Sequence, residues 1–221
     1  ERTIKSVLGQ TYSNIQYVII DGNSNVESAE IFACYRDRID ILISESDRGI
    51  YDAMNKGIGY ADGDWICFMN SNDYFHDEKV LEDIFSDNPG EDIIYGYCID
   101  PADGRVIKPL PLEKFWKRIP MNHQSAFVRT RYHREYPFDL RYSISSVYDF
   151  FYHWYCQGLK FRYVDRPVAV YDMKGISFYA FRWLWDYIRI AMKYSNGKRI
   201  RVVYRFFYMM MVRIWINLFR R

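Results

Sequence analysis

Short apolar runs alternate with longer segments in which apolar residues recur every three or four positions along roughly the first half of the chain. The short runs are typical of buried strands, and the longer segments are typical of amphipathic helices. We predict an opening helix that ends near Gln10, strands at 15–20, 39–43, 65–69 and 93–99, and helices at 28–37, 50–60 and 77–85. Strands that alternate with helices favour crossover connections. The first half is therefore expected to be α/β, with a mostly parallel sheet flanked by helices.

The regular alternation stops after Asp100, where the chain becomes rich in proline, at positions 101, 109, 111 and 120. Beyond this region the pattern predicts a strand at 125–128, a helix at 147–157, and strands at 161–164 and 168–171. Two aromatic-rich helices, at 178–194 and 201–219, follow. We expect a domain over residues 1–173 and a tail of amphipathic helices over residues 174–221.

Polar residues gather where two of the predicted strands end. Asp21 follows the strand at 15–20 and opens a turn-forming run, while Asn70, Ser71, Asn72 and Asp73 follow the strand at 65–69. Open α/β sheets bind ligands at the carboxyl ends of their strands. A ligand site is therefore expected here, although an Asx turn or a helix cap would also suit Asp21.

The segment from Ser44 to Ile58 reads SESDRGIYDAMNKGI, and a strand ending in NSND at 70–73 follows it. These motifs, together with SVLGQTY at 6–12 and IIDGNS at 19–24, resemble glycosyltransferase family 2. The resemblance is greatest to the bacterial members that build envelope polysaccharides of the capsular and colanic-acid type. It implies a GT-A fold, a mostly parallel mixed sheet, and a nucleotide-diphosphate sugar as donor. Members begin with a strand that this chain lacks, so we expect the domain to be missing its first strand.

The resemblance also implies roles for individual residues. In the family, the aspartate at the position of Asp21 contacts the base, and the loop and helix that begin at Asp47 line the nucleotide pocket. Asn55 and Lys56 are then expected near the base and the phosphates, where Lys56 offers positive charge. A helix facing solvent would show the same pattern at Asn55.

Residues 70–73 occupy the place of the family's metal-binding D-x-D motif. Two positions that are often aspartate are Asn70 and Asn72 here, which leaves Asp73 as the carboxylate for Mg²⁺ or Mn²⁺. One protein carboxylate together with substrate phosphates is a normal arrangement for Mg²⁺. We therefore expect metal use, with Asn70 and Asn72 contacting the nucleotide sugar.

The sequence departs from the family at the general base. Members carry it in a motif like Asp-Tyr-Asp-Phe, and the corresponding residues here are Val147, Tyr148, Asp149 and Phe150. Valine cannot accept a proton, so either Asp149 acts as the base or the protein is catalytically impaired. A structural role for Asp149 in the first turn of its helix is equally compatible with the sequence.

His123 and Gln124 form a pair that recurs in the resembling subgroup near the donor diphosphate or the acceptor. A lone histidine is more often structural, so sequence alone favours this role only weakly. The four histidines and four cysteines show no metal-ligand spacing, and the cysteines are typical of reduced thiols in a cytosolic protein.

The charge is unevenly distributed along the chain. Residues 174–221 carry eleven Lys or Arg and one acid, a net +10, so the rest of the chain carries −8 to give the overall +2. Arg205 and Arg213 interrupt the apolar tail, which favours a helix lying at a membrane surface over one that spans it. Packing on the domain or in a homodimer is the alternative. Nucleic-acid binding is disfavoured because the apolar face would first need to be buried.

These observations lead to one expected function and two rivals. We expect a cytoplasmic, inverting glycosyltransferase, peripheral on the inner face of the membrane through residues 178–221, that transfers sugar to a lipid-linked or polysaccharide acceptor. The first rival is a non-catalytic homologue that binds nucleotide sugar or serves as a complex subunit. The second is a nucleic-acid-binding protein with a basic tail.

Overall fold

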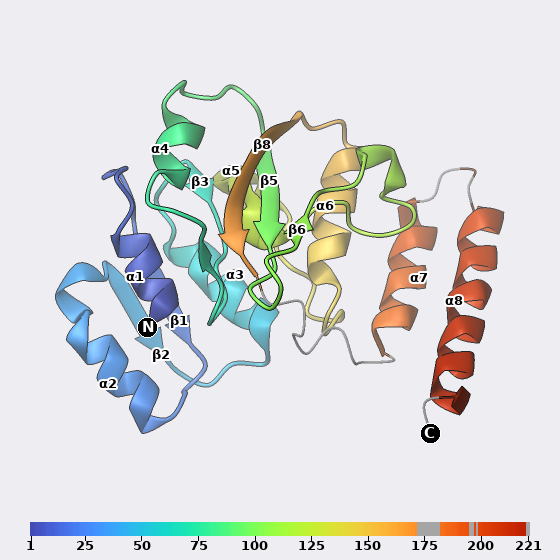
Figure 1. The fold of residues 1–221 in the computed structure, drawn as a ribbon, viewed down its shortest axis with the longest axis horizontal. Helices are drawn as coiled ribbons and strands as arrows, with labels where there is room; N and C mark the ends of the chain where they lie inside the picture. The colour runs from blue at the N-terminus through green and yellow to red at the C-terminus, as the bar shows by residue number, and fades with distance from the viewer. Residues whose placement is uncertain (172–181, 195–196, 198, 220–221) are drawn as a thin grey trace.

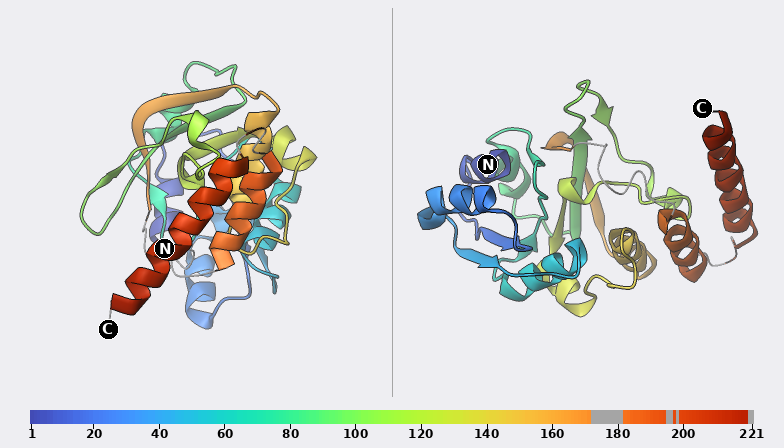
Figure 2. Two further views of the ribbon diagram at one scale, coloured as in Figure 1. Left: turned by 90° about the vertical axis from the view of Figure 1, so that its right-hand side faces the viewer. Right: turned by 90° about the horizontal axis from the view of Figure 1, so that it is seen from below.

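The computed structural model describes residues 1–171, 182–194, 197 and 199–219 (Figure 1). A small parallel sheet with α1 and α2 forms one end of the molecule, and a larger sheet occupies the middle. Three helices, α6, α7 and α8, lie in a row at the other end, with α8 outermost (Figure 2). The site candidates lie at strand ends, in the loops that follow them, and on helices α3 and α6.

The amino-terminal part contains α1 (Arg2–Leu8), β1 (Val18–Asp21), α2 (Val26–Cys34), a 3-10 turn, β2 (Ile41–Ser44) and α3 (Ile50–Tyr60). The two strands pair in parallel, with Val18 opposite Ile41 and Asp21 opposite Ser44. The side chain of Asn25 caps α2 by accepting a hydrogen bond from the Ser28 N–H at 3.1 Å. Helix α3 covers the predicted range 50–60 and packs against β1, where Ile20 lies beneath Gly57.

The larger sheet has the order β3 (Trp65–Ile66), β7 (Ala126–Arg129), β5 (Ile93–Ile99), β8 (Phe161–Val170) and β4 (Tyr74–Phe75). A short strand β6 (Val106–Ile107) also pairs with β5. The helices that complete this part are α4 (Val80–Phe85), α5 (Thr130–Glu135) and α6 (Ser146–Cys156). The predicted α/β class is confirmed. Among the described strands, however, only the pairs β1–β2 and β5–β8 are parallel, because the chain after Asp100 returns through irregular loops instead of crossover helices.

Strand β5 is the centre of the larger sheet, and its pairing with β8 is irregular at Gly96. Tyr95 pairs with Tyr163 and Tyr97 with Pro167, so β8 uses more residues than β5 over this stretch. Proline has no N–H for the ladder, and a bulge is a place where a strand tolerates it. A Cβ atom at Gly96 would lie 2.7 Å from the Arg166 carbonyl oxygen. Only glycine fits there without moving the backbone of β8.

Helix α6 is buried on almost all sides. Eight of its eleven residues are buried, among them Val147, Tyr148, Phe150 and Trp154. A helix that is apolar all round is covered on every face. Here the sheet and the 112–138 region cover one side, and α7 (Arg182–Tyr194) covers another, where the rings of Tyr148 and Tyr187 stack at 4.3 Å.

The last helix, α8 (Arg199–Phe219), has apolar residues on two faces. Val202 and Phe206 are buried towards α7. Seven large side chains described on the rest of this helix are exposed: Ile200, Val203, Tyr204, Phe207, Tyr208, Met211 and Val212. Within the described residues, no helix has the length and hydrophobicity to cross a membrane. The predicted residues 178–181 of the preceding helix lie outside the described part of the chain.

Local patterns misjudged several element lengths. The strand expected at 65–69 ends at Ile66, and the strands expected at 161–164 and 168–171 form one strand, β8. The bulge beside Gly96 carries the strand past Pro167. Helix α5 was not predicted because it is only six residues long.

Gly96→Ala is expected to destabilise the protein by about 1–3 kcal/mol, because its Cβ would clash with the β8 backbone. The measurement is the free energy of unfolding in urea. Gly59→Ala is the matched control, since nothing lies within 4 Å of its added Cβ and Gly59 is in α3. Alanine there should stabilise the helix by up to about 1 kcal/mol. Equal stability of Gly96→Ala and the wild type would contradict the close approach.

Candidate functional site

Asp21 ends β1, and its carboxylate closes the turn that follows. It accepts hydrogen bonds from the Ser44 hydroxyl at 2.6 Å and from the Ser24 N–H at 3.1 Å. Burial alone would raise the pKa of Asp21, but these hydrogen bonds outweigh it and hold the pKa below its ordinary value. Asp21 is therefore an ionised group at the carboxyl end of β1, and part of its hydrogen-bonding capacity serves the turn.

Asp47 lies directly against the residue that follows Asp21. A Cβ atom on Gly22 would be 2.4 Å from the Asp47 carboxylate oxygen Oδ2, so the missing side chain makes room for this carboxylate. The other oxygen, Oδ1, accepts a hydrogen bond from the Gly49 N–H at 2.8 Å. The structure thus brings two predicted site residues, Asp21 and Asp47, to the same edge of the small sheet.

The two predicted residues on α3 have protein partners. The Asn55 amide donates to the Phe138 carbonyl at 2.8 Å and accepts from the Phe138 N–H at 2.9 Å, so both of its polar atoms are paired with backbone. Lys56 pairs with Glu45 at 2.7 Å. Asn55 thereby ties α3 to the chain beyond α5. Its assignment to nucleotide binding stays a prediction, and so does that of Lys56.

Residues 70–73 form a tight turn between β3 and β4. The Asp73 N–H donates to the Asn70 carbonyl at 3.1 Å, and Asn72 adopts a left-handed conformation with φ of 72°. Asparagine tolerates this conformation better than most residues other than glycine. As a result Asn72 is exposed and Asp73 turns inward, where only 6% of it is accessible.

Gln124 holds the Asp73 carboxylate in place. Its Nε2 donates to Asp73 Oδ2 at 3.0 Å, across 51 positions of sequence. Gln124 lies in a 3-10 turn before β7, and the adjacent Ser125 hydroxyl bonds to the Gly96 carbonyl at 3.2 Å. The irregular centre of β5 therefore positions the partner of Asp73.

His123 contacts the other end of the same turn. Its Nε2 lies 3.1 Å from the Asn70 amide nitrogen, so in the tautomer protonated at Nδ1 it accepts a hydrogen bond. Burial lowers the pKa of His123 to about 4. The ring is neutral at pH 7 and can offer hydrogen bonds, but no positive charge, to a ligand.

Asp149 has other partners, at the contact of α6 with α7. It is 1% exposed and accepts hydrogen bonds from Tyr136 at 2.8 Å, Lys193 at 3.0 Å and Tyr194 at 3.2 Å. Lys193 neutralises the carboxylate, and the two tyrosines cover it. These contacts favour an anchoring role for Asp149, and its catalytic role stays a prediction.

The structure joins Asn70, Asp73, His123 and Gln124 into one polar cluster, and Asp21 with Asp47 into another. In the described parts of the chain, no group of three His, Cys, Asp or Glu residues could hold a metal ion. Asp73 with the oxygens of Asn70 or Asn72 suits a hard cation only if a ligand supplies further oxygens.

Sequence reasoning missed several contributors to these clusters. Ser24 and Ser44 bond to Asp21, and Lys193 pairs with Asp149. Ser44 is the first residue of the motif that resembles the family, so the motif could have identified Ser44 as a site residue. Lys193 gave no such signal, because its partner lies 44 positions earlier.

Comparison with known proteins agrees with the motifs. Residues 1–187 match the family model for glycosyl transferase family 2. A PGL/p-HBAD biosynthesis glycosyltransferase of Mycobacterium bovis is 28% identical over 181 residues, or 78% of this chain and 71% of that protein. The amylovoran biosynthesis glycosyltransferase AmsB of Erwinia amylovora is 26% identical, over 77% of this chain and 64% of its own.

Solved structures show the same fold. TarS of Staphylococcus aureus, crystallised with UDP, superposes with a TM-score of 0.67 at 15% identity, over 86% of this chain and 59% of its own. A mannosyltransferase of Pyrobaculum calidifontis, in complex with GDP-Man and Mn²⁺, gives 0.62 at 14% identity, over 90% of this chain and 59% of its own. At such identities the likeness concerns the fold alone. The match of the family model to most of the chain, together with the motifs around Asp21 and Asp73, shows that this protein belongs to glycosyl transferase family 2.

Proposed function

We propose that the protein is an inverting glycosyltransferase that moves a sugar from a nucleotide-diphosphate donor to an envelope glycan. The observation that carries the proposal is the Asp73–Gln124 hydrogen bond of 3.0 Å next to the Asn70–His123 contact of 3.1 Å. A buried carboxylate, neutral hydrogen-bonding groups and a tight turn thus occur together in the segment that resembles the family's donor motif, and this supports the proposal. Relatives named for polysaccharide biosynthesis and structures named for UDP and GDP-Man complexes support the class of donor and product.

Within this proposal, Asp73 would hold Mg²⁺ or Mn²⁺ together with the donor diphosphate. The ion would neutralise charge that develops on the leaving diphosphate. Gln124 fixes the carboxylate through its hydrogen bond, and His123 orients the Asn70 amide. Because His123 is neutral, its ring adds no positive charge here, and a metal ion would supply the counter-charge.

Asp21 and Asp47 are the proposed contacts for the nucleoside. Both carboxylates lie at the edge of the small sheet, and carboxylates accept hydrogen bonds from a base or a ribose. Asp21 is held ionised by its serine partners, so it is ready to act as an acceptor.

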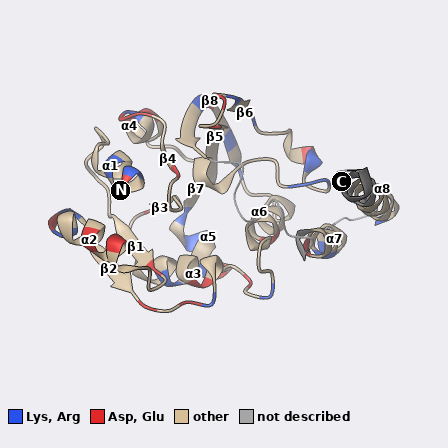
Figure 3. Ribbon diagram, turned by 60° about the horizontal axis from the view of Figure 1, so that its bottom comes forward, with Lys and Arg blue, Asp and Glu red and all other residues tan. Residues whose placement is uncertain are grey.

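The proposed acceptor is a lipid-linked glycan at the inner face of the cell membrane. The support is the exposed apolar face of α8, with basic residues and no acidic residue along that helix (Figure 3). Aromatic and basic side chains on one helix suit the interfacial zone of an anionic membrane.

A catalytically impaired homologue that binds donor is the second candidate. Val147 stands at the family's base position, and Asp149 is covered by Tyr136, Lys193 and Tyr194. A base must reach the acceptor hydroxyl within hydrogen-bonding distance. In the described contacts, Asp149 is instead bound to α7.

Asp73→Asn is expected to weaken Mn²⁺-dependent binding of a nucleotide-diphosphate sugar at least about tenfold, because the metal loses its carboxylate. Chelation with EDTA should weaken wild-type binding similarly and have little effect on the variant. The measurement is calorimetric titration with UDP- and GDP-sugars, followed by a scan of donor hydrolysis.

Asp87→Asn is the control, since Asp87 is exposed and has no described side-chain partner. It should bind donor like the wild type. If the wild-type protein binds no nucleotide-diphosphate sugar with or without metal, the proposed function is wrong.

The variants Asp149→Asn and Lys193→Met test whether Asp149 anchors α7 or acts as the general base. If the pair anchors α7, each variant breaks the same contact, and each should cost about 1–3 kcal/mol of unfolding free energy. The double variant should cost less than the sum of the two. Both single variants should reduce sugar transfer by a similar factor while donor binding persists.

The exposed pair Lys108–Asp165, also 3.0 Å apart, is the matched control. Its coupling in the same double-mutant cycle should stay below about 1 kcal/mol. Abolished transfer in Asp149→Asn, with near-normal transfer in Lys193→Met, would instead assign Asp149 as the base.

A further inference from the structure

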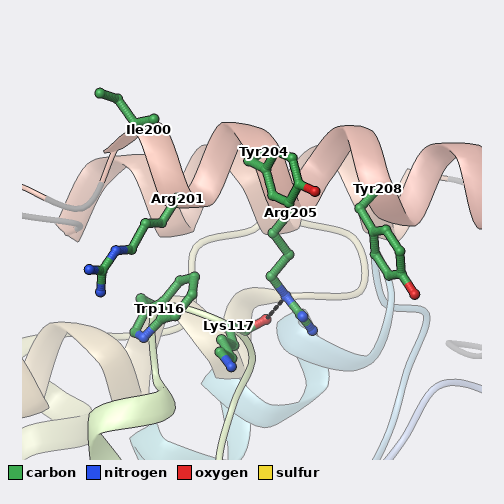
Figure 4. A pocket seen from close by; sticks show the side chains of 7 residues that line it. All are labelled: Trp116, Lys117, Ile200, Arg201, Tyr204, Arg205 and Tyr208. Atoms are coloured by element: carbon green, nitrogen blue, oxygen red, sulfur yellow. Dashed lines mark hydrogen bonds between the residues drawn. The ribbon is translucent and has the colours of Figure 1, made fainter.

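A groove of about 420 Å³ runs between α8 and the segment that carries Trp116 and Lys117 (Figure 4). Arg201, Arg205 and Tyr208 point from α8 towards this segment. The groove lies outside both polar clusters of the donor site. Its size is that of sites for small ligands.

Three cations line this groove: Lys117, Arg201 and Arg205. None of them forms an ion pair with a described carboxylate. The Arg205 Nε donates only to the Lys117 carbonyl at 3.3 Å, and the Lys117 ammonium lies 5.1 Å from the centre of the Trp116 ring. A cluster of positive charge without acids is complementary to an anion.

The other lining residues are apolar or aromatic, and they continue into the exposed face of α8. Tyr204 and Tyr208 belong both to the groove and to that face, which extends to Phe207 and Met211. A free anion needs no such surface, whereas a lipid presents a charged head group joined to apolar chains. The arrangement therefore suits an amphipathic anion.

We infer that this groove binds the phosphate or diphosphate head group of a membrane lipid, with the lipid chains against the exposed face of α8. Three cations exceed the single charge of a phosphodiester, and a phosphomonoester or diphosphate, which carries about two negative charges, comes nearer to balancing them. The inference rests on the proposed membrane contact and gives it a specific head-group chemistry.

The test measures co-sedimentation of the full chain with two kinds of phosphatidylcholine vesicle. One kind contains phosphatidic acid, and the other contains phosphatidylglycerol at the same surface charge. Binding should be stronger to phosphatidic acid. Lys117→Gln/Arg205→Gln should lose at least about tenfold in affinity for those vesicles and bind both types alike. Arg201→Gln should lose about fivefold in affinity for phosphatidic acid vesicles. Because Arg201 is exposed, this variant should fold normally, so it tests the groove even if the double variant misfolds.

The matched control is Arg2→Gln/Lys160→Gln, which removes the same charges from α1 and from the loop before β8. It should bind phosphatidic acid vesicles within about twofold of the wild type. Equal losses in both double variants, or equal binding to the two anionic lipids, would overturn the inference in favour of general charge attraction.

Three further outcomes are decisive. Inorganic phosphate or pyrophosphate that binds as tightly as the vesicles would show a site for free phosphate and overturn the lipid assignment. A stable dimer that buries the exposed face of α8 and does not bind vesicles would also overturn the lipid assignment. Binding of the nucleotide-diphosphate sugar tests the lipid groove and the proposed transferase function separately. It should persist in Lys117→Gln/Arg205→Gln. If the wild type binds no donor, the proposed transferase function is wrong, but the lipid groove is not contradicted.

Discussion

The close approach of β8 to β5 at Gly96 is the constraint on which the larger sheet depends. Strand β5 is bonded to β6, β7 and β8, so a change at its centre reaches every part of this sheet. The bulge lets Pro167 lie within β8 and keeps the strand continuous from Phe161 to Val170. Without it, β8 would end early and β4, which pairs with its carboxyl end, would lose its partner.

The same constraint extends into the donor site. The Gly96 carbonyl receives the Ser125 hydroxyl, and the neighbouring Gln124 holds Asp73. A backbone irregularity in the sheet thus orients the carboxylate on which the proposed metal chemistry depends. The Asn-rich turn contributes by directing Asp73 inward, so that one carboxylate is presented in a defined orientation.

Helix α6 links this domain to the carboxyl-terminal helices. Its buried surface faces the core on one side and α7 on the other, and the Asp149–Lys193 pair joins α6 to α7. Helix α8 then packs on α7 and leaves an apolar face exposed. The glycosyltransferase domain and the surface proposed to contact a membrane are thereby held in one structure through α6.

The sequence by itself determined the α/β class, the bounds of α3 and β5, and the family. These depend on local periodicity and on motifs of neighbouring residues. Only the tertiary structure decided which side chains meet. Gln124 reaches Asp73, Asn55 binds the backbone of Phe138, and Lys193 pairs with Asp149, over 51, 83 and 44 positions. Periodicity shows that a residue is buried, but its partner depends on how distant elements pack, and several polar residues fit any one pattern equally well.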